Sequence, residues 1–307
     1  MNRLPLNFYD ALFSMLYTPT IGKLRDLVGP YGAFAHEMFE NRYDYAFNIK
    51  NDVIVKEEIY NYSRCGFESS TTPREKFMEL VSIVLCGPYE GPVKCNISER
   101  IREVQGDHEC DLSVLSDTIS KEWIDWACLW KGLTCFSLLE ELEETAIELC
   151  QQLVDTCKLE QLVVCYEGCG AIEFGLIKSV LVQDQFDTLR LTFYDAAVLE
   201  ELFQFCAENS ARLKGKNIQL QSPEVCDVSV STLLEGKLEL CSNEESDSIV
   251  KDHRFFYRSI LRESSRPYKF LNGQSLAYLF LECNGKEKEV GELEFLKKTD
   301  DIIIFFV

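Results

Sequence analysis

The middle of the chain repeats a small unit, and this repetition constrains the fold more than any other feature of the sequence. Short apolar runs with partly alternating polarity occur at Leu159–Glu167, Phe186–Asp195 and Leu213–Gln221, as expected for half-buried strands. Two segments with helical spacing, Ile172–Val182 and Ala196–Arg212, lie between and after the first two runs. The sequence therefore predicts an alternation of strand and helix.

The period of this unit indicates a class of repeat. Aligning Leu162 with Leu189 and Ile218 gives offsets of 27 and 29 residues. These offsets fall within the range of leucine-rich-type repeats, in which each unit contributes one strand and one helix. A fourth, shorter copy is expected at Lys237–Cys241. The asparagine ladder of a standard leucine-rich repeat is absent, so we expect a degenerate repeat and a curved sheet.

Composition excludes several classes of function and location. The formal net charge of −20 over 307 residues disfavours nucleic acid and anionic membrane surfaces as partners, because both are negatively charged. No stretch approaches the roughly 18 apolar residues of a membrane span, and the N-terminus lacks the apolar core of a signal peptide. We therefore expect a cytoplasmic or nuclear protein whose 14 cysteines are reduced thiols.

The N-terminal block contains three candidate helices. A Leu4-Pro5 pair begins the first, and the apolar residues Phe8, Leu12 and Leu16 follow at helical spacing. Proline is tolerated at a helix start because its missing N–H would be unpaired there. The expected breaks and later segments are, in order, Thr18-Pro19, Ile21–Val28, Gly29-Pro30 and Ala33–Arg42. These short helices need a partner or the rest of the chain to bury their apolar faces.

This block resembles a divergent F-box, a helical module that docks cullin-type ubiquitin ligases through a small adaptor. The runs LPLNFYDALFSML and AFAHEMFENR are similar to the expanded nematode families of F-box-related proteins, whose C-terminal regions are leucine-rich-like. The resemblance implies that Leu4, Pro5, Phe8 and Leu12 bind the adaptor. The chain departs from the family pattern because it lacks the late tryptophan and has Gly29-Pro30 where a helix often continues. The alternative is a helical cap over the repeat core.

The region between this block and the repeats combines strand and helix signals. Tyr43–Ile49 and Asp52–Tyr60 alternate in polarity and predict a hairpin, whereas Lys76–Leu85 fits either a helix or a buried strand. The only tryptophans, Trp123, Trp126 and Trp130, share a helical face, which favours a packed junction over an aromatic ligand site. Ser137–Lys158 is predicted as a helix, with Ser137 and Glu140 forming a capping box.

Strand signals return near the C-terminus. A helix is expected at Val250–Arg262 after the polar loop that follows Cys241. Three strands are expected at Leu276–Cys283, Glu287–Phe295 and Ile302–Val307, with Asn284-Gly285 as the strongest hairpin signal in the chain. We expect this β-meander to close the C-terminal end of the sheet and to hide its edge.

Catalytic and metal-binding patterns are missing from the sequence. The three histidines, His36, His108 and His253, lie in different regions, and no serine or cysteine triad motif accompanies them. His108-Glu109-Cys110 lacks a second ligand pair at zinc spacing, and Gly168 with Gly170 lacks the third glycine of a dinucleotide fingerprint. We therefore expect no cofactor, no metal and no enzymatic activity.

These patterns together predict a mixed α/β chain in three parts. The expected parts are an F-box-like helical module at residues 1–45, a linking region with the hairpin and the tryptophan helix at residues 46–135, and a leucine-rich-like domain at residues 136–307. The function expected from them is non-enzymatic protein binding, as a subunit that recruits an unidentified target to a cullin-type ligase. The alternative is a repeat-type scaffold without a ligase role.

Overall fold

Strands and helices alternate along most of the described chain. The structure, a computed structural model, describes residues 8, 12, 18–50, 53–61, 66–69, 78–87, 97, 99–102, 108–165, 171–192, 196–221, 239–242, 244–245, 268–272, 275–282 and 301–307. The helices are α2 (Thr18–Leu24), α3 (Pro30–Asn41), α5 (Lys121–Leu129), α6 (Glu144–Val154), α7 (Ala171–Leu181) and α8 (Ala196–Glu208). The strands are β1 (Tyr43–Lys50), β2 (Val53–Asn61), β3 (Gly66–Ser69), β4 (Met78–Cys86), β5 (Glu109–Leu115), β6 (Leu133–Leu138), β7 (Gln161–Cys165), β8 (Thr188–Thr192), β9 (Asn217–Gln221), β10 (Glu239–Leu240), β11 (Tyr268–Asn272), β12 (Ser275–Glu282) and β13 (Asp301–Phe306).

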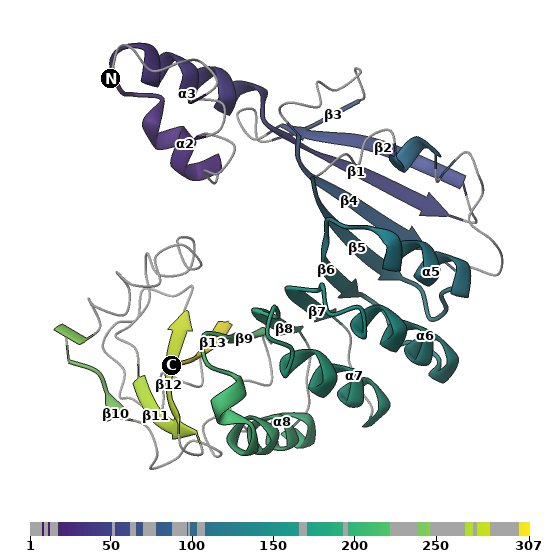
Figure 1. Cartoon of the computed structure of the whole chain (residues 1–307), viewed down its shortest axis with the longest axis vertical. Helices are drawn as coiled ribbons and strands as arrows, with labels where there is room; N and C mark the ends of the chain where they lie inside the picture. The colour runs from purple at the N-terminus through teal and green to yellow at the C-terminus, as the bar shows by residue number, and fades with distance from the viewer. Residues whose placement is uncertain are drawn as a thin grey trace.

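All of these strands belong to one sheet, which follows an arc with α5–α8 on its outer side (Figure 1). Its order is β10-β11-β12-β13-β9-β8-β7-β6-β5-β4-β1-β2-β3. β1 and β4 to β9 run parallel to one another. Antiparallel strands extend the sheet at both ends, with β2 and β3 beyond β1 and with β13, β12, β11 and β10 beyond β9. The expected mixed α/β class is thus confirmed.

The strand register confirms the predicted repeat alignment. Leu162 of β7 pairs with Leu189 of β8, which pairs in turn with Ile218 of β9. The same row continues toward the N-terminus, where Leu162 pairs with Phe136 of β6 and Phe136 pairs with Leu112 of β5. The strand–helix repeat therefore begins well before the segment in which its period is visible in the sequence.

The sheet is continuous across both of the expected domain boundaries. The boundary after residue 45 lies inside β1, and the boundary after residue 135 lies inside β6. β1 pairs with β4, and β6 pairs with both β5 and β7. Residues 43–50 and 133–138 are therefore shared elements of the sheet rather than linkers between separate units.

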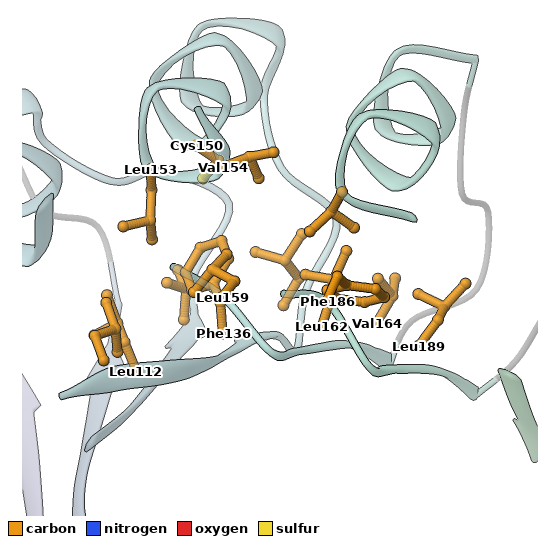
Figure 2. Close-up of a cluster of buried hydrophobic side chains, with 14 of the residues drawn as sticks. Leu112, Phe136, Cys150, Leu153, Val154, Leu159, Leu162, Val164, Phe186 and Leu189 are labelled. Carbon is orange, nitrogen blue, oxygen red and sulfur yellow. The ribbon is translucent and has the colours of Figure 1, made fainter. Parts of the chain in front are cut away.

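The core lies between the sheet and the outer helices. Leu112, Phe136, Leu162 and Leu189 are on successive strands and are directed toward the helices, where α6 contributes Cys150, Leu153 and Val154 (Figure 2). All seven side chains are buried. Burying a leucine or phenylalanine side chain fully contributes roughly 1.5–3 kcal/mol. Each strand–helix unit thus gains its burial from contact with its neighbours.

Long polar side chains satisfy carbonyl groups where each helix turns back into the next strand. Lys158 Nζ donates to Ala127 O at 2.6 Å and to Trp130 O at 2.7 Å. In a later repeat, Lys216 Nζ donates to Phe186 O at 2.7 Å and also to Gln183 O. Each lysine thus donates to the end of the preceding repeat's helix or to the turn that follows it, so these bonds connect neighbouring repeats.

Two predicted helix boundaries are wrong. Ser137 belongs to β6 and does not cap a helix, because α6 begins only at Glu144. Leu142, in the intervening loop, is buried, so its spacing from Leu138 and Ala146 imitates a helical period across a loop. Thr18-Pro19, expected as the end of the first helix, forms the first two residues of α2, in keeping with the tolerance for proline in the first turn.

Other local predictions are settled by the structure. β1 and β2 form the predicted antiparallel hairpin, and the ambiguous segment Lys76–Leu85 becomes strand β4 over Met78–Cys86. Trp123, Trp126 and Trp130 are buried and stack edge to face, with ring centroids 5.1 and 4.4 Å apart. The tryptophan stripe is therefore core packing, as predicted.

The C-terminal strands differ in part from the prediction. β10 contains the expected fourth copy, but it lies at the far end of the sheet, and β13 occupies the position beside β9. β12 and β13 match two of the three expected meander strands, yet they pair directly with each other. The predicted strand Glu287–Phe295, the Asn284-Gly285 turn and the helix Val250–Arg262 lie outside the described residues. Ile302–Phe306 is buried on both faces, which suits a strand inside a sheet.

Replacing Lys216 by methionine is expected to lower the free energy of unfolding by roughly 1–3 kcal/mol, because it removes the ammonium donor from the carbonyl of Phe186, whereas Gln183 O still accepts from Phe186 N. The substitution retains most of the apolar stem of the side chain, so the ammonium is the main loss. Urea unfolding followed by circular dichroism measures the change. Lys214→Met is the control, since Lys214 is exposed two residues away and its loss should change stability little. Equal effects at the two positions would contradict the proposed role of the ammonium.

Candidate functional site

The structure places two of the four predicted adaptor-binding residues. Phe8 and Leu12 both have helical backbone, and they are separated by one helical turn in sequence. The side chain of Phe8 is 45% exposed, whereas Leu12 is half-buried. Leu4 and Pro5 lie outside the described residues. Of the two described side chains, Phe8 is therefore the more exposed to solvent.

Helices α2 and α3 pack against each other and against the core. Ile21, Ala35 and Met38 are buried. The Arg25 guanidinium lies 4.8 Å from the centroid of the Phe39 ring, which is close enough for a cation–π contact. The turn between the helices is tight, because a Cβ on Gly32 would lie 1.6 Å from the carbonyl oxygen of Leu27.

A buried ion pair attaches this helical pair to the sheet. Arg42, the C-cap of α3, is buried, and its Nη1 lies 3.1 Å from Glu79 Oε1 on β4. At a second point, Asn61 Nδ2 on β2 donates to the carbonyl of Glu40 at 3.3 Å. The N-terminal helices are thus held to the first strands of the sheet by polar contacts as well as by apolar packing.

The face of the sheet opposite α5–α8, here named the inner face, carries mostly small or neutral side chains. Because side chains alternate along a strand, the residues next to those of the core line this face. On β4 to β9 they are Ser82, Val84, Asp111, Ser113, Cys135, Ser137, Val163, Cys165, Arg190, Thr192, Gln219 and Gln221. All but the buried Ser137 are half-buried. The part contributed by β4 to β6 was missed from the sequence, although Glu109–Leu115 alternates clearly in polarity.

Local hydrogen bonds hold several of these side chains in place. Arg190 Nε donates to Gln219 Oε1 at 3.0 Å across β8 and β9, and Cys165 Sγ donates to Thr192 Oγ1 at 3.4 Å. Burial, with the Asp111 charge as a second cause, raises the pKa of the Cys135 thiol to about 12. A thiol with such a pKa stays protonated at neutral pH and is a poor nucleophile. The inner face therefore offers contact surface instead of a reactive cysteine.

Asp111 is the most perturbed carboxyl group on the inner face. Burial raises its pKa to about 7, and the charges of Glu109 and Asp44 add to the effect, while a hydrogen bond with Cys135 opposes it. A carboxyl group with this pKa is partly protonated near neutral pH. The folded chain therefore retains a proton there that the unfolded chain releases at lower pH.

Within the described ranges, no group of three or more histidine, cysteine, aspartate or glutamate side chains could hold a metal ion. Cys110 of the sequence triplet His108-Glu109-Cys110 is buried, and its thiol donates to the carbonyl of His108. In the same described ranges, no helix is both long enough and apolar enough to cross a membrane.

Comparison with known proteins identifies no relative of the chain. No family model matches the chain, and the searches of curated proteins and of solved structures give no significant match.

Replacing Asp111 by asparagine is expected to change the pH dependence of stability. Because the folded pKa is raised above the unfolded value, the parent chain loses stability as the pH rises from about 4 to about 7, and the loss persists above that window. The variant should therefore be more stable than the parent by roughly 1–3 kcal/mol at about pH 8, and by less than half of that at about pH 5, where only part of the loss has accumulated. Urea unfolding at both pH values measures this difference.

Asp26→Asn is the control for this comparison, because the Asp26 side chain is 85% exposed. It should give the same stability as the parent at both pH values. An equal gain in stability at about pH 8 and at about pH 5 would contradict the assignment of the pH dependence to the raised pKa of Asp111.

Proposed function

We propose that the chain is a non-enzymatic protein-binding adaptor, which recruits a target protein to a cullin-type ubiquitin ligase. One observation carries the proposal: an N-terminal helical pair precedes a curved sheet of parallel strand–helix repeats whose inner face is lined by half-buried, mostly small side chains. Curved repeat sheets present extended surfaces suited to binding macromolecules. Cytoplasm or nucleus is the location in which such an adaptor would act.

In this proposal, the N-terminal segment binds the adaptor of the ligase. The residues proposed to bind it are Leu4, Pro5, Phe8 and Leu12. The exposure of Phe8 supports this assignment, because exposed apolar side chains that gather into a patch mark interaction sites. Leu27 and Val28, in the turn between α2 and α3, are also exposed. They add apolar surface to the same end of the chain.

In the same proposal, the inner face of the repeat sheet binds the target protein. The small side chains on β4 to β7 let a bound backbone approach the sheet closely, and Arg190 offers a cation beside them. No residue in this arrangement needs to act as an acid, base or nucleophile for binding to occur. Burial shifts Asp111 and Cys135 on the inner face toward their neutral forms, and a contact surface needs no charge at these two positions.

A second function, that of a scaffold without a ligase role, is supported by the packing of α2 and α3. Ile21, Ala35 and Met38 belong to the same continuous apolar cluster as the core of the repeats. In that case the N-terminal helices only cap the core. The two functions differ in one respect, which is whether the apolar surface around Phe8 binds the adaptor of the ligase.

Binding of the purified chain to the purified adaptor of a cullin ligase, measured by isothermal titration calorimetry, tests the proposal. The Leu4→Ala, Pro5→Ala, Phe8→Ala variant is expected to lose at least about tenfold in affinity, equivalent to about 1.4 kcal/mol. Leu129→Ala removes an apolar side chain that is 78% exposed on α5, and it should bind like the parent. If the folded parent chain fails to bind the adaptor, the ligase role is wrong and the scaffold alternative stands.

A further inference from the structure

A cavity of about 520 Å³ lies at the end of the sheet where β10, β11 and β12 pair. Its lining residues are Glu239, Glu245, Lys269, Phe270, Leu271 and Leu276. The volume falls within the range of sites that hold a small molecule or a few side chains of a peptide. In the strand order, it lies at the opposite end of the sheet from β1, the strand that follows the N-terminal helices.

Strand register shows that this cavity continues the inner face. Glu239 pairs with Lys269, and Lys269 pairs with Tyr278. The same row passes through Phe305 of β13 to Asn217 of β9. Directly paired residues lie on the same face of a sheet. A partner bound along the inner face of the repeats therefore meets this cavity when it reaches the antiparallel end.

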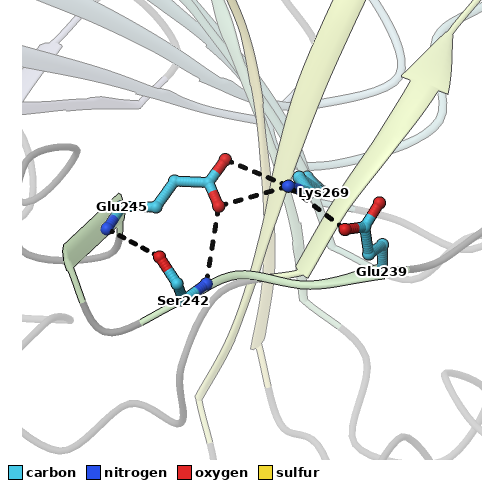
Figure 3. Close-up of polar contacts among 4 residues, drawn as sticks. All are labelled: Glu239, Ser242, Glu245 and Lys269. Carbon is cyan, nitrogen blue, oxygen red and sulfur yellow. Dashed lines mark hydrogen bonds and ion pairs between the residues drawn. The ribbon is translucent and has the colours of Figure 1, made fainter.

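The polar side of the cavity has two carboxylates for one ammonium (Figure 3). Lys269 Nζ lies 3.3 Å from Glu239 Oε1 and 3.2 Å from Glu245 Oε2. Glu245 is held from both sides, because its backbone N–H donates to Ser242 Oγ and its carboxylate accepts from the backbone N–H of Ser242. The local charge is therefore negative, and Lys269 is already paired with an anchored glutamate.

Glu239 is the carboxylate that can accept a further cation. Its side chain is 74% exposed. Among the described residues, Lys269 is its one ion-pair partner. An incoming ammonium or guanidinium can therefore bind the exposed carboxylate of Glu239, and Lys269 still has Glu245 as a partner. Attraction to the overall charge of −20 favours the same kind of ligand.

The apolar side of the cavity is formed by a pair of leucines on neighbouring strands. Leu271 of β11 pairs directly with Leu276 of β12. Leu271 is 71% exposed, whereas Leu276 is half-buried and packs against the cluster that contains Tyr278 and Phe305. An aliphatic side chain placed on this pair would remove apolar surface from water, which is favourable at about 25 cal/mol per Å².

We propose that this cavity binds a basic and apolar segment of a partner protein, in which a lysine or arginine contacts Glu239 and a neighbouring leucine or isoleucine packs on Leu271 and Leu276. The inference rests on the target-binding part of the proposed function and gives that target a chemistry. It is independent of whether the N-terminal helices bind a ligase adaptor.

Fluorescence anisotropy with a fluorescein-labelled octapeptide of alternating leucine and lysine tests the proposal. The Glu239→Gln, Leu271→Ser variant is expected to raise the Kd of this peptide at least about tenfold. Both positions are exposed, so the variant should fold. The matched control is Glu122→Gln, Leu129→Ser, which removes the same charge and the same apolar group from exposed positions on α5 and should leave the Kd unchanged. Peptides with glutamate in place of lysine, or serine in place of leucine, should bind more weakly.

Three results would overturn the proposal. They are no binding of the leucine–lysine peptide to the parent chain, an equal loss in the control variant, and equal binding of the serine-containing peptide, which would indicate attraction by net charge alone. Titration of the same variants with the ligase adaptor separates this proposal from the proposed function. If the chain binds the peptide but not the adaptor, the cavity proposal stands and the ligase role is wrong. If it binds the adaptor but not the peptide, the ligase role stands and the cavity proposal is wrong.

Discussion

The fold depends on hydrogen bonds that pass from one repeat to the next at the turns between helix and strand. A strand–helix unit of this size cannot bury its own apolar face, so adjacent units must stack in a fixed register. Lys158 and Lys216 fix that register, because each reaches back to carbonyls of the preceding turn. Backbone bonds repeat the pattern, since Glu160 N donates to Thr134 O and Asp187 N donates to Glu160 O. Burial lowers the pKa of both lysines, so their ammonium groups depend on these carbonyls for solvation.

The outermost parallel strands, β1 and β9, must have their edges covered, because an exposed strand edge can pair with other chains. The two ends of the sheet do this differently. At the N-terminal end, β2 pairs antiparallel with β1, and β3 pairs with β2. At the other end, β13 pairs antiparallel with β9 and is followed outward by β12, β11 and β10. β13 takes this place because Ile302–Phe306 is apolar at every position. A strand of that composition is stable only when both of its faces are covered.

Sequence reasoning was most reliable where the period was regular and least reliable where buried loops imitate helices. The offsets that relate Leu162, Leu189 and Ile218 became the strand register, because each strand begins at the same point of its repeat. The earlier copies were missed because Ile83, Leu112, Phe136 and Leu162 are separated by 29, 24 and 26 residues, which obscures a fixed period. The cavity at β10 to β12 was missed from the sequence for two reasons. Lys269, Leu271 and Leu276 lie on one β11–β12 hairpin, whose Asn272-Gly273 signal was overlooked. Glu239 and Glu245 come from an earlier segment, and its pairing with β11 has no local signal.

A solenoid of this kind separates the residues that stabilise it from the residues that are free to bind. Stability resides on the outer side, where side chains such as Leu162 and Lys216 are buried and their partners belong to neighbouring repeats. On the inner face, Asp111 lowers stability at neutral pH because burial and neighbouring carboxylates oppose its charge. A residue that reduces stability persists most easily where the fold does not depend on it. The inner face can therefore change its chemistry from strand to strand, from the small side chains of β4 to β7 to the acidic and apolar cavity at β10 to β12, while the register of the core stays the same.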